Sequence, residues 1–495
     1  MWENIRSLFR ALFENPFSKY HTLQLMIVAP PELERILAQT AELQKAYLVG
    51  GCVRDALLGI PHKDFDIEVF DITYEQLATA LSRWGKTDLV GRSFGVVKLR
   101  VGEFVFDFTI PRRDSKVAPG HKGFDITFDP SITLQEAASR RDFTVNALMF
   151  DPRGKEILDF FGGKADLEKG ILRHTSEAFI EDPLRVLRGM QFAARFNLQA
   201  APETLQLCRQ IKGSFSELAI ERVREEWFKW AEKSAIPSAG LRFLRDTEWI
   251  EHFPELQHMI GTPQDPEWHP EGDVFTHTCH CCDALVRLPE WKAADAESRI
   301  VYSLAMLLHD CGKPQTTHEE LRKGKVRIVS PGHENAGIPI AETFLNRTGT
   351  PTAIRERVLP LIQNHMAHYD EITDRAVRRL ARRIAPETIE GLCTIMTADR
   401  LGRPPQPPQV PHTVIALLQK AHELKVQKSA PKPILLGRHL IEIGMQPSPE
   451  FGKILHEAYE AQLEGLFFDP PQARQWLATH PLLPENARER LRTND

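Results

Sequence analysis

Short hydrophobic runs, each ended by turn-forming residues, mark the first 170 positions of the chain. Residues 46–49 are such a run and predict a buried strand, which the pair Gly50-Gly51 ends. Residues 52–58 suit a short helix, and residues 65–70 alternate apolar and polar side chains in the manner of a second strand. Strands and short helices in this order predict an α+β fold built on a small mixed sheet.

Three aspartates follow the alternation of the predicted strands. Asp64 and Asp66 are two residues apart, so both carboxylates leave the strand on one face, while the apolar residues beside them leave on the other. In a hairpin predicted for 93–100 and 103–110, Asp107 stands opposite the alternating aromatic residues. A site with only two or three protein carboxylates suits Mg²⁺, which keeps water and phosphate as its other ligands. Aspartates at a solvated strand edge would give the same sequence pattern.

Helical spacing of apolar positions replaces this pattern further along the chain. Residues 192–253 and 434–463 follow it, and residues 2–13 do so in an amphipathic form. Residues 111–130 are polar and contain Gly and Pro, which predicts a loop, and the prolines of 404–408 interrupt the helices. We therefore expect a mostly α-helical remainder after the α+β head.

Composition sets the class of the protein. Its 495 residues suggest three or four domains of about 100–200 residues. A hydrophobic share of 42% and a charged share of 26% are ordinary for a soluble globular protein. The net charge of −5 means that a nucleic-acid partner would need local basic patches. Seven cysteines without regular spacing, no signal peptide and no membrane-spanning run predict a cytoplasmic protein with reduced thiols.

Groups suited to binding a nucleoside triphosphate surround the predicted strands. The N–H groups of Gly50-Gly51 can approach phosphate closely, with Arg54 nearby. Further on, Arg141 and Asp142 stand beside another arginine and an asparagine. Such a set can clamp phosphate through arginine and sugar hydroxyls through aspartate.

A helix predicted after Pro183 carries groups that can read a base. Asp182, Arg185 and Arg188 are three residues apart and share one helix face. A carboxylate accepts from an exocyclic amine, and a guanidinium donates to a ring nitrogen or carbonyl. Cytosine and adenine satisfy both contacts, whereas uracil and guanine place a carbonyl where the amine should be. The pattern predicts selection of C and A, with a helix cap and an ion pair as the alternative.

Histidines and aspartates are spread over the helical second half. His309-Asp310 ends an apolar helix, and a charged pair there needs a partner, for which a divalent metal is economical. The run Cys279 to Cys282 is not expected to bind zinc, because adjacent ligands on a helix diverge. A one-sided stripe of arginines between 375 and 383 fits either a solvated face or a track for RNA phosphates.

The head motifs resemble those of bacterial tRNA nucleotidyltransferases of class II, the CCA-adding enzymes, and of the related poly(A) polymerases. The resemblance runs from about residue 45 to about 480 and implies a polymerase-β-type nucleotidyltransferase head. It makes Asp64 and Asp66 the ligands of catalytic Mg²⁺ and Asp107 a third catalytic carboxylate. One departure is Gln191, where relatives often have arginine. The implied nucleotide-binding residues are Gly50, Gly51, Arg54, Arg141, Asp142, Asp182, Arg185 and Arg188.

The later motifs resemble the HD metal-dependent phosphohydrolase family. The resemblance implies a divalent metal on His277, His309, Asp310 and Asp399. His333 and His365 would bind a second metal or phosphate. The expected organisation is an N-terminal extension (1–44), the head (45–172), a helical neck with the base-reading helix (173–260), the HD domain (261–403), a Pro-rich linker (404–433) and a helical tail (434–495).

These resemblances imply an enzyme that adds CMP and AMP to tRNA 3′ ends from CTP and ATP without a template. They add a phosphohydrolase activity of the HD domain on RNA 3′ ends. The predicted loop at 111–130 favours full CCA addition, because the family needs a flexible loop there for the last adenosine. Alternatives are a poly(A) polymerase, an A-adding or CC-adding enzyme, an HD-type RNA-end phosphohydrolase, and a non-catalytic tRNA-binding protein. No membrane association is expected, and the sequence indicates no protein partner.

Overall fold

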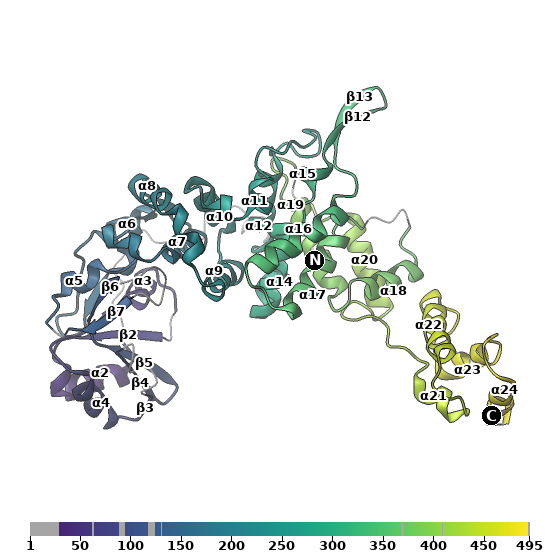
Figure 1. The fold of residues 1–495 in the computed structure, drawn as a ribbon, viewed down its shortest axis with the longest axis horizontal. Helices are drawn as coiled ribbons and strands as arrows, with labels where there is room; N and C mark the ends of the chain where they lie inside the picture. Colours follow the sequence, from purple (N-terminus) through teal and green to yellow (C-terminus); the bar gives the residue numbers. More distant parts are fainter. Residues whose placement is uncertain are drawn as a thin grey trace. The chain divides into compact units, whose positions relative to one another are not determined.

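A computed structural model describes residues 29–61, 64–88, 95–116, 124–129, 131–367, 371–407 and 409–493. The chain divides into two compact units (Figure 1). The first unit is Met1–Gln257 with Asn346–Gly349, and the second is His258–Leu345 with Thr350–Asp495. The amphipathic helix predicted for residues 2–13 lies outside the described residues. Within them, every helix is too short or too polar to cross a bilayer.

A seven-stranded mixed sheet forms the head within the first unit. Its order is β3-β4-β5-β2-β1-β8-β9, and β2 and β5 pair in parallel, whereas the other neighbours pair antiparallel. The predicted α+β fold is therefore confirmed. The strands are β1 (Ala46–Val49), β2 (Asp64–Val69), β3 (Lys86–Asp88), β4 (Val96–Val101), β5 (Phe104–Thr109), β8 (Met149–Asp151) and β9 (Glu156–Leu158).

Residues 29–44 are in contact with the head. Helix α2 (Pro31–Gln39) buries Leu33 and Ile36 completely. Arg153 donates to the carbonyl oxygens that end this segment, which ties it to the sheet. The boundary expected at residue 44 stays a prediction, although α2 packs on the head. The other head helices are α3 (Gly51–Leu57), α4 (Tyr74–Ser82), α5 (Leu134–Ser139) and α6 (Gly163–Lys169).

The prediction of a loop at 111–130 is wrong for most of the residues that the structure describes in this range. Strands β6 (Arg112–Lys116) and β7 (Phe124–Phe128) pair antiparallel across it. The sequence of β7 alternates apolar and polar residues, a signal that the neighbouring Gly and Pro outweighed in the prediction. Residues 117–123 and Pro130 lie outside the described residues.

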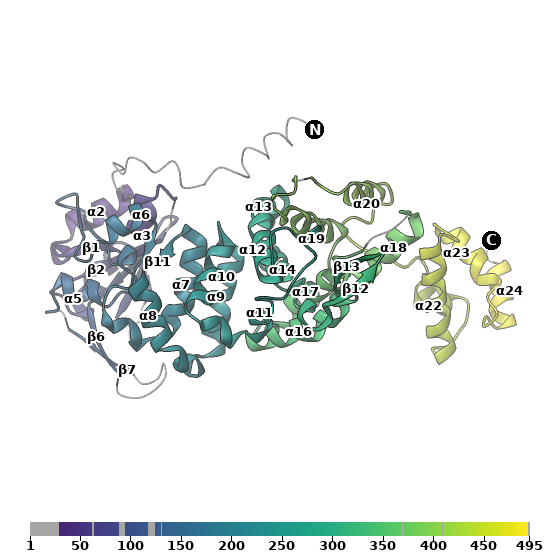
Figure 2. The same cartoon turned by 90° about the horizontal axis from the view of Figure 1, so that it is seen from above.

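A helical neck completes the first unit. Helix α7 (Leu184–Phe196) packs beside α9 (Ile220–Lys233) and α10 (Pro237–Asp246), as both cartoon views show (Figures 1 and 2). The helices α8 (Pro202–Gln210) and α11 (Pro254–Gln257) accompany them. The core of this neck is aromatic, with Trp227, Trp230, Trp249 and Phe253 fully buried. Helix α7 packs on two of the helices that form this core, and the predicted base-reading residues lie just before α7 and in its first half.

The second unit is built on helices that bring distant histidines together. Helix α12 (Val274–Leu285) packs on α19 (Ile389–Leu401), and α14 (Ala296–Leu308) packs on α17 (Thr352–Asn364). The end of α14 is apolar and buried, as its sequence predicts. The remaining helices around this core are α13 (Pro289–Ala293), α15 (Lys313–Thr316) and α16 (His333–Arg347).

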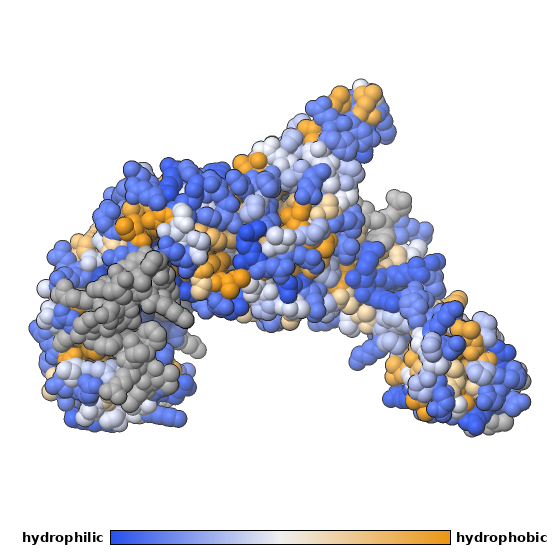
Figure 3. Space-filling view, in the orientation of Figure 1, coloured by the Kyte–Doolittle hydropathy of each residue, from blue (hydrophilic) through white to orange (hydrophobic). Residues whose placement is uncertain are grey.

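A β-hairpin projects from the second unit (Figure 1). It consists of β12 (His318–Arg322) and β13 (Lys325–Val329), which pair antiparallel. Leu321 and Val326 face each other near its end, with 71% and 64% of their surface exposed. The space-filling view shows this apolar tip on an otherwise polar arm (Figure 3).

The range expected to be a Pro-rich linker, 404–433, contains a helix. Helix α20 (His412–Glu423) packs on α18 (Asp374–Arg383) and α19 through Val414 and Leu417. Of the prolines that suggested a linker, those at 404, 405 and 407 precede α20, and Pro408 lies outside the described residues. Apolar residues at helical spacing, which the prediction overlooked, explain the helix.

The arginine stripe of α18 pairs with acidic residues of the tail. Arg375 and Arg379 contact Glu464, and Arg379 and Arg382 contact Glu460. These ion pairs hold part of the stripe against the tail, and its role as a track for RNA phosphates stays a prediction. The tail has its own apolar core and consists of α21 (Gly437–Glu442), α22 (Pro449–Glu464), α23 (Pro470–Ala478) and α24 (Glu485–Thr493).

Candidate functional site

Three aspartates meet on one face of the head sheet, where β2 and β5 run side by side. Asp66 lies opposite Asp107 in the register, and Asp64 precedes Asp66 on the same exposed face. Phe65 and Ile67 are buried on the opposite face. The alternation of the sequence is therefore preserved in the structure, and it places the three predicted carboxylates together.

The three carboxylates fit a divalent cation. Lys98 contacts one oxygen of Asp107 at 2.7 Å, whereas the other oxygen is buried without a hydrogen-bond partner. Burial raises the pKa of Asp66, and the charges of Asp107 and Asp64 add to this rise against the opposing charge of Arg141. Crowded carboxylates with an unpartnered oxygen lack positive charge, which a cation bound to them would supply.

Arg141 lies between the glycine turn and the carboxylate strand. Gly50 leads from β1 into α3 with φ of 73°, a conformation that glycine adopts without strain. A Cβ atom at this position would lie 2.7 Å from Nη1 of Arg141. The same guanidinium reaches Glu68 on β2 at 3.4 Å. The turn, the arginine and the carboxylates therefore form one surface.

Arg54 is more enclosed than the sequence suggests. Only 3% of its surface is exposed, and its guanidinium donates to Asp55 and Asn146. The guanidinium carbon also lies 4.3 Å from the ring centre of Phe196 on α7. These contacts tie the head to the neck, so the binding of phosphate by Arg54 stays a prediction.

Asp182 lies two residues before α7 and has partners that the sequence did not reveal. One oxygen accepts from the N–H of Leu184 at 3.2 Å, and the other lies 2.8 Å from Nη2 of Arg222 on α9. The ion pair with Arg185, which the alternative to base reading required, does not form between these two described residues. Arg222 belongs to a stretch that sequence reasoning treated as scaffold, because nothing in its spacing points to Asp182.

Arg185 and Arg188 of α7 contact the head segment that includes Arg140 and Asp142. Arg185 donates to the carbonyl oxygens of Ala178 and Arg140 at 2.7 Å each. The residue after Arg140 is Arg141, whose guanidinium lies beside Gly50. Arg188 donates to Asp142 at 2.7 Å. Although burial opposes it, Arg188 holds the pKa of Asp142 below its usual value. The predicted nucleotide-binding residues of α7 and of the head are thus joined by direct contacts.

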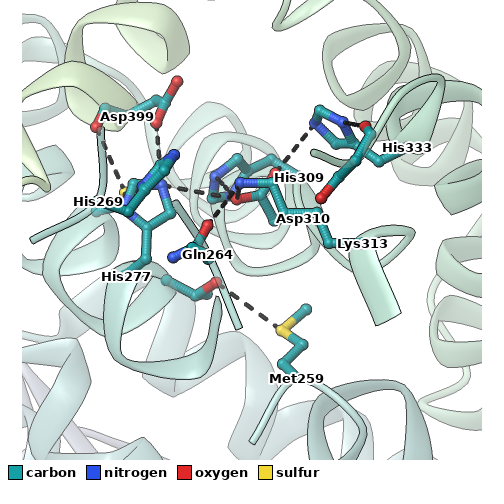
Figure 4. Close-up of polar contacts among 12 residues, drawn as sticks. Met259, Gln264, His269, His277, His309, Asp310, Lys313, His333 and Asp399 are labelled. Carbon is teal, nitrogen blue, oxygen red and sulfur yellow. Dashed lines mark hydrogen bonds and ion pairs between the residues drawn. The ribbon is translucent and has the colours of Figure 1, made fainter. Parts of the chain in front are cut away.

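A second cluster lies in the second unit, where four buried groups predicted to bind metal converge (Figure 4). His277 Nε2 lies 3.0 Å from Asp399 and 3.6 Å from Asp310. His309 donates from Nδ1 to a carbonyl oxygen of α14, which leaves Nε2 facing the cluster. This Nε2 lies 3.2 Å from Oδ2 of Asp310, which also pairs with Lys313 at 2.7 Å. Imidazole nitrogens and carboxylate oxygens that converge in one buried cluster fit a metal ion.

His333 and His365 form a second group on the other oxygen of Asp310. Their Nε2 atoms lie 3.2 Å apart, and both face Oδ1 of Asp310 at 3.2 and 3.7 Å. Each Nδ1 contacts a backbone carbonyl, so each Nε2 presents a lone pair when the ring is neutral. Burial opposes the protonation of His333, yet Asp310 raises its pKa. The pair therefore favours a positive charge between its rings.

Supporting residues around the cluster were missed in the sequence. Glu271 accepts from Nδ1 of His277 at 2.7 Å and from His269 at 2.9 Å, which leaves Nε2 of His277 free to bind metal. Despite its burial, these hydrogen bonds lower the pKa of Glu271 to about 2. Lys313 and Arg403 similarly pair with the two aspartates of the cluster. The spacing of three between Asp310 and Lys313 and that of four between Asp399 and Arg403 could have signalled these two contacts.

Of the cysteine run at 279–282, one member joins the cluster. Cys281 lies 3.3 Å from Nε2 of His277, one helical turn away, whereas Cys279 and Cys282 are buried elsewhere on α12. The expectation that the run does not bind zinc as a unit agrees with these directions.

Relatives with known names match most of this chain. Residues 46–173 match the model of the poly(A) polymerase head domain, and residues 274–403 match that of the HD domain. The "Multifunctional CCA protein" of Methylococcus capsulatus is 34% identical over 426 residues, which cover 83% of this chain and 93% of the relative. That of Xanthomonas campestris pv. campestris is 36% identical over 372 residues, with 72% and 85% covered.

Solved structures share the fold. A Bacillus stearothermophilus CCA-adding enzyme in complex with CTP has a TM-score of 0.60 at 21% identity and covers 88% of this chain and 94% of its own. A Thermotoga maritima CCA-adding enzyme complexed with tRNA has a TM-score of 0.54 at 19% identity, with 99% and 98% covered. These structures show the fold alone, whereas the sequence identity and coverage of the named relatives also show the family. By this measure, the chain belongs to the family of multifunctional CCA proteins.

Proposed function

We propose that this chain is a template-independent tRNA nucleotidyltransferase that adds CMP and AMP to tRNA 3′ ends from CTP and ATP. The observation that carries the proposal is the register of β2 and β5, which places Asp64, Asp66 and Asp107 on one face beside Arg141. The relatives called multifunctional CCA proteins support the same activity. Its substrates would place the protein in the cytoplasm.

The head carboxylates would hold Mg²⁺, since oxygen ligands on a strand suit this ion. Magnesium bound there would assist attack of the tRNA 3′-hydroxyl on the α-phosphate of the nucleotide. Arg141 lies where it can bind the triphosphate bidentately. Asp107, whose free oxygen is buried, is the candidate to orient the hydroxyl or take its proton.

Product analysis separates this proposal from its rivals. Purified protein is incubated with tRNA lacking its 3′ end and with CTP, ATP or both. A CCA-adding enzyme needs both nucleotides to complete the end, a CC-adding enzyme stops after two cytidines, and an A-adding enzyme or a poly(A) polymerase uses ATP alone. Binding of tRNA without any incorporation would refute the proposal and favour a non-catalytic protein.

Changing Asp182 to asparagine is expected to lower the preference for CTP over UTP about 10- to 100-fold. A carboxylate only accepts hydrogen bonds, so it rejects the O4 carbonyl of uracil, whereas the asparagine amide can also donate to it. The measurement is the ratio of kcat/KM for CMP and UMP incorporation.

The matched control for this prediction is Arg222→Gln. It removes the same ion pair but keeps the Asp182 carboxylate, so it is expected to preserve the preference. An Asp182→Asn protein that discriminates as the wild type does would contradict base reading by Asp182.

Gly50→Ala is expected to lower incorporation about tenfold, because the new Cβ would displace Arg141. Gly102→Ala is the control, since Gly102 also has positive φ, but a Cβ added to it would have no atom within 4 Å. Both variants should lose about 1–2 kcal/mol of stability from backbone strain. Thermal unfolding and incorporation are measured together, and an equal loss of activity in both would contradict the positioning of Arg141.

A second activity is proposed for the HD cluster, because its buried imidazole and carboxylate ligand atoms lie close enough together to hold a metal ion. We infer a metal-dependent phosphohydrolase acting on phosphate groups at RNA ends, including 2′,3′-cyclic phosphates. A divalent metal would supply an activated water at neutral pH. His277, His309, Asp310 and Asp399 would bind it, with a second metal or phosphate at His333 and His365, and Lys313 would balance the carboxylate charge.

A further inference from the structure

The HD cluster opens into a cavity of about 640 Å³, which is larger than one phosphate group requires. Asp310, Asp399 and Lys313 line its charged part. Its other lining combines apolar residues, among them Trp268, Ile328 and Met396, with charged ones, among them Arg322, Arg400 and Arg403. The cavity therefore offers an apolar part next to the phosphate-handling groups.

Trp268 is exposed in this lining. Among the tryptophans of the described residues, it alone has a mostly exposed side chain, with 59% of its surface accessible. Large aromatic side chains usually bury their rings, and an exposed one beside a polar site is more often used for binding. The face of the indole is thus available to a ligand.

The loop that carries Trp268 is held in place from two sides. The backbone N–H of Trp268 donates to the backbone carbonyl of Asp265 at 3.0 Å. The carboxylate of Asp265 pairs with Arg327 of β13 at 3.1 Å. From the other side, Gln406 donates to the carbonyl oxygens of Glu267 and Trp268 at 3.2 Å each. A ring on such a loop loses little conformational freedom when a ligand stacks on it.

Trp268 is also connected to the candidate metal ligands through the residue that follows it in the chain. The next residue, His269, packs its ring against that of His277, with centroids 4.6 Å apart (Figure 4). A group bound at the metal cluster would therefore have the indole within the same cavity. This neighbourhood resembles a site for a phosphate ester that carries a flat ring.

We propose that Trp268 is a stacking platform for the base of a nucleotide bound at the HD site, which makes it a residue that favours substrates carrying a base over base-free esters. This inference rests on the proposed phosphohydrolase function and names a specificity-determining residue of that site. In the reaction, the oxygen of water bonds to phosphorus as one ester P–O bond of the cyclic phosphate breaks, and the released ribose oxygen takes a proton. Stacking of a base would hold the ribose while this occurs.

The test compares Trp268→Ala with Trp268→Phe in the full-length, metal-loaded protein. The substrates are adenosine 2′,3′-cyclic phosphate, an RNA oligonucleotide that ends in a 2′,3′-cyclic phosphate, and a base-free methyl riboside 2′,3′-cyclic phosphate. Because base–aromatic stacking contributes a sizeable free energy, Trp268→Ala should raise KM about 5- to 100-fold for the substrates that carry a base. Its kcat, and its activity on the base-free ester, should change little. Trp268→Phe should keep most of the affinity, and the two base-bearing substrates separate free nucleotides from RNA ends.

Phe468→Ala is the control, since Phe468 is an equally exposed aromatic residue in the second unit, with 61% of its surface accessible. Equal losses on all three substrates, or none, would overturn the stacking role of Trp268. If the wild-type protein hydrolyses none of them, the phosphohydrolase proposal fails by itself. Equilibrium binding of adenosine 2′-monophosphate then decides the inference: weaker binding by Trp268→Ala but not by Phe468→Ala supports it, and unchanged binding overturns it.

Discussion

Replacing Asp66 with asparagine is expected to reduce the incorporation of both CMP and AMP about 1,000-fold or more, equivalent to roughly 4 kcal/mol of transition-state stabilisation. Asp66 lies beside Asp64 and Asp107 on the sheet. Burial and the negative charges of these two carboxylates raise the pKa of Asp66. An amide of the same shape removes the negative charge that a divalent cation requires. Incorporation of labelled nucleotide into tRNA lacking its 3′ end measures the effect.

Asp71→Asn is the matched control for this experiment. Asp71 follows the same strand, is more than half exposed and pairs with Lys45, and asparagine tolerates its positive φ of 56°. The control should retain wild-type activity within about twofold, since exposed ion pairs contribute little. An Asp66→Asn protein that keeps more than a tenth of wild-type activity would refute the catalytic role of this carboxylate.

Asp310→Asn is expected to abolish phosphohydrolase activity, by about 1,000-fold or more, while CCA addition continues. One oxygen of Asp310 faces His277 and His309, and the other faces His333 and His365. The substitution therefore weakens both parts of the metal site at once. Metal content after dialysis should fall along with activity, and chelation of the wild-type protein should reproduce the loss.

The same variant tests the stability of the cluster. Asp310 is buried and pairs with Lys313 at 2.7 Å, and a buried pair that loses one partner typically costs about 3–5 kcal/mol. Glu342→Gln, on the exposed face of α16, serves as the control and should change neither metal content nor thermal unfolding. An Asp310→Asn protein that still binds metal at wild-type stoichiometry would contradict the assignment.

Local alternation made the head carboxylates predictable. Asp64 and Asp66 needed only the period of a strand, which depends on adjacent residues, and Asp107 needed only the same rule applied to a hairpin. The same reliance on local signals explains the errors. Gly and Pro outweighed the alternation of β7, and prolines hid the apolar spacing of α20. Each error arose where turn residues stand next to a regular element.

Partners distant in the sequence were not predictable. Arg222 pairs with Asp182 across 40 positions, and Arg54 meets Asn146 across 92. Such pairs depend on how helices pack, which no local pattern records. Glu271 lies nearer to its partner His277, yet it precedes α12 and reaches back to it through a turn. The residues that orient the functional groups were therefore found only in three dimensions.

The ligand sets of the two units differ in kind. The head offers carboxylate oxygens, which hard ions such as Mg²⁺ prefer, whereas the second unit offers imidazoles with carboxylates, which suit transition metals. The two proposed activities of the chain would thus depend on different metal ions. Depletion of the transition metal would stop hydrolysis at RNA termini, whereas the addition of nucleotides to tRNA ends would continue.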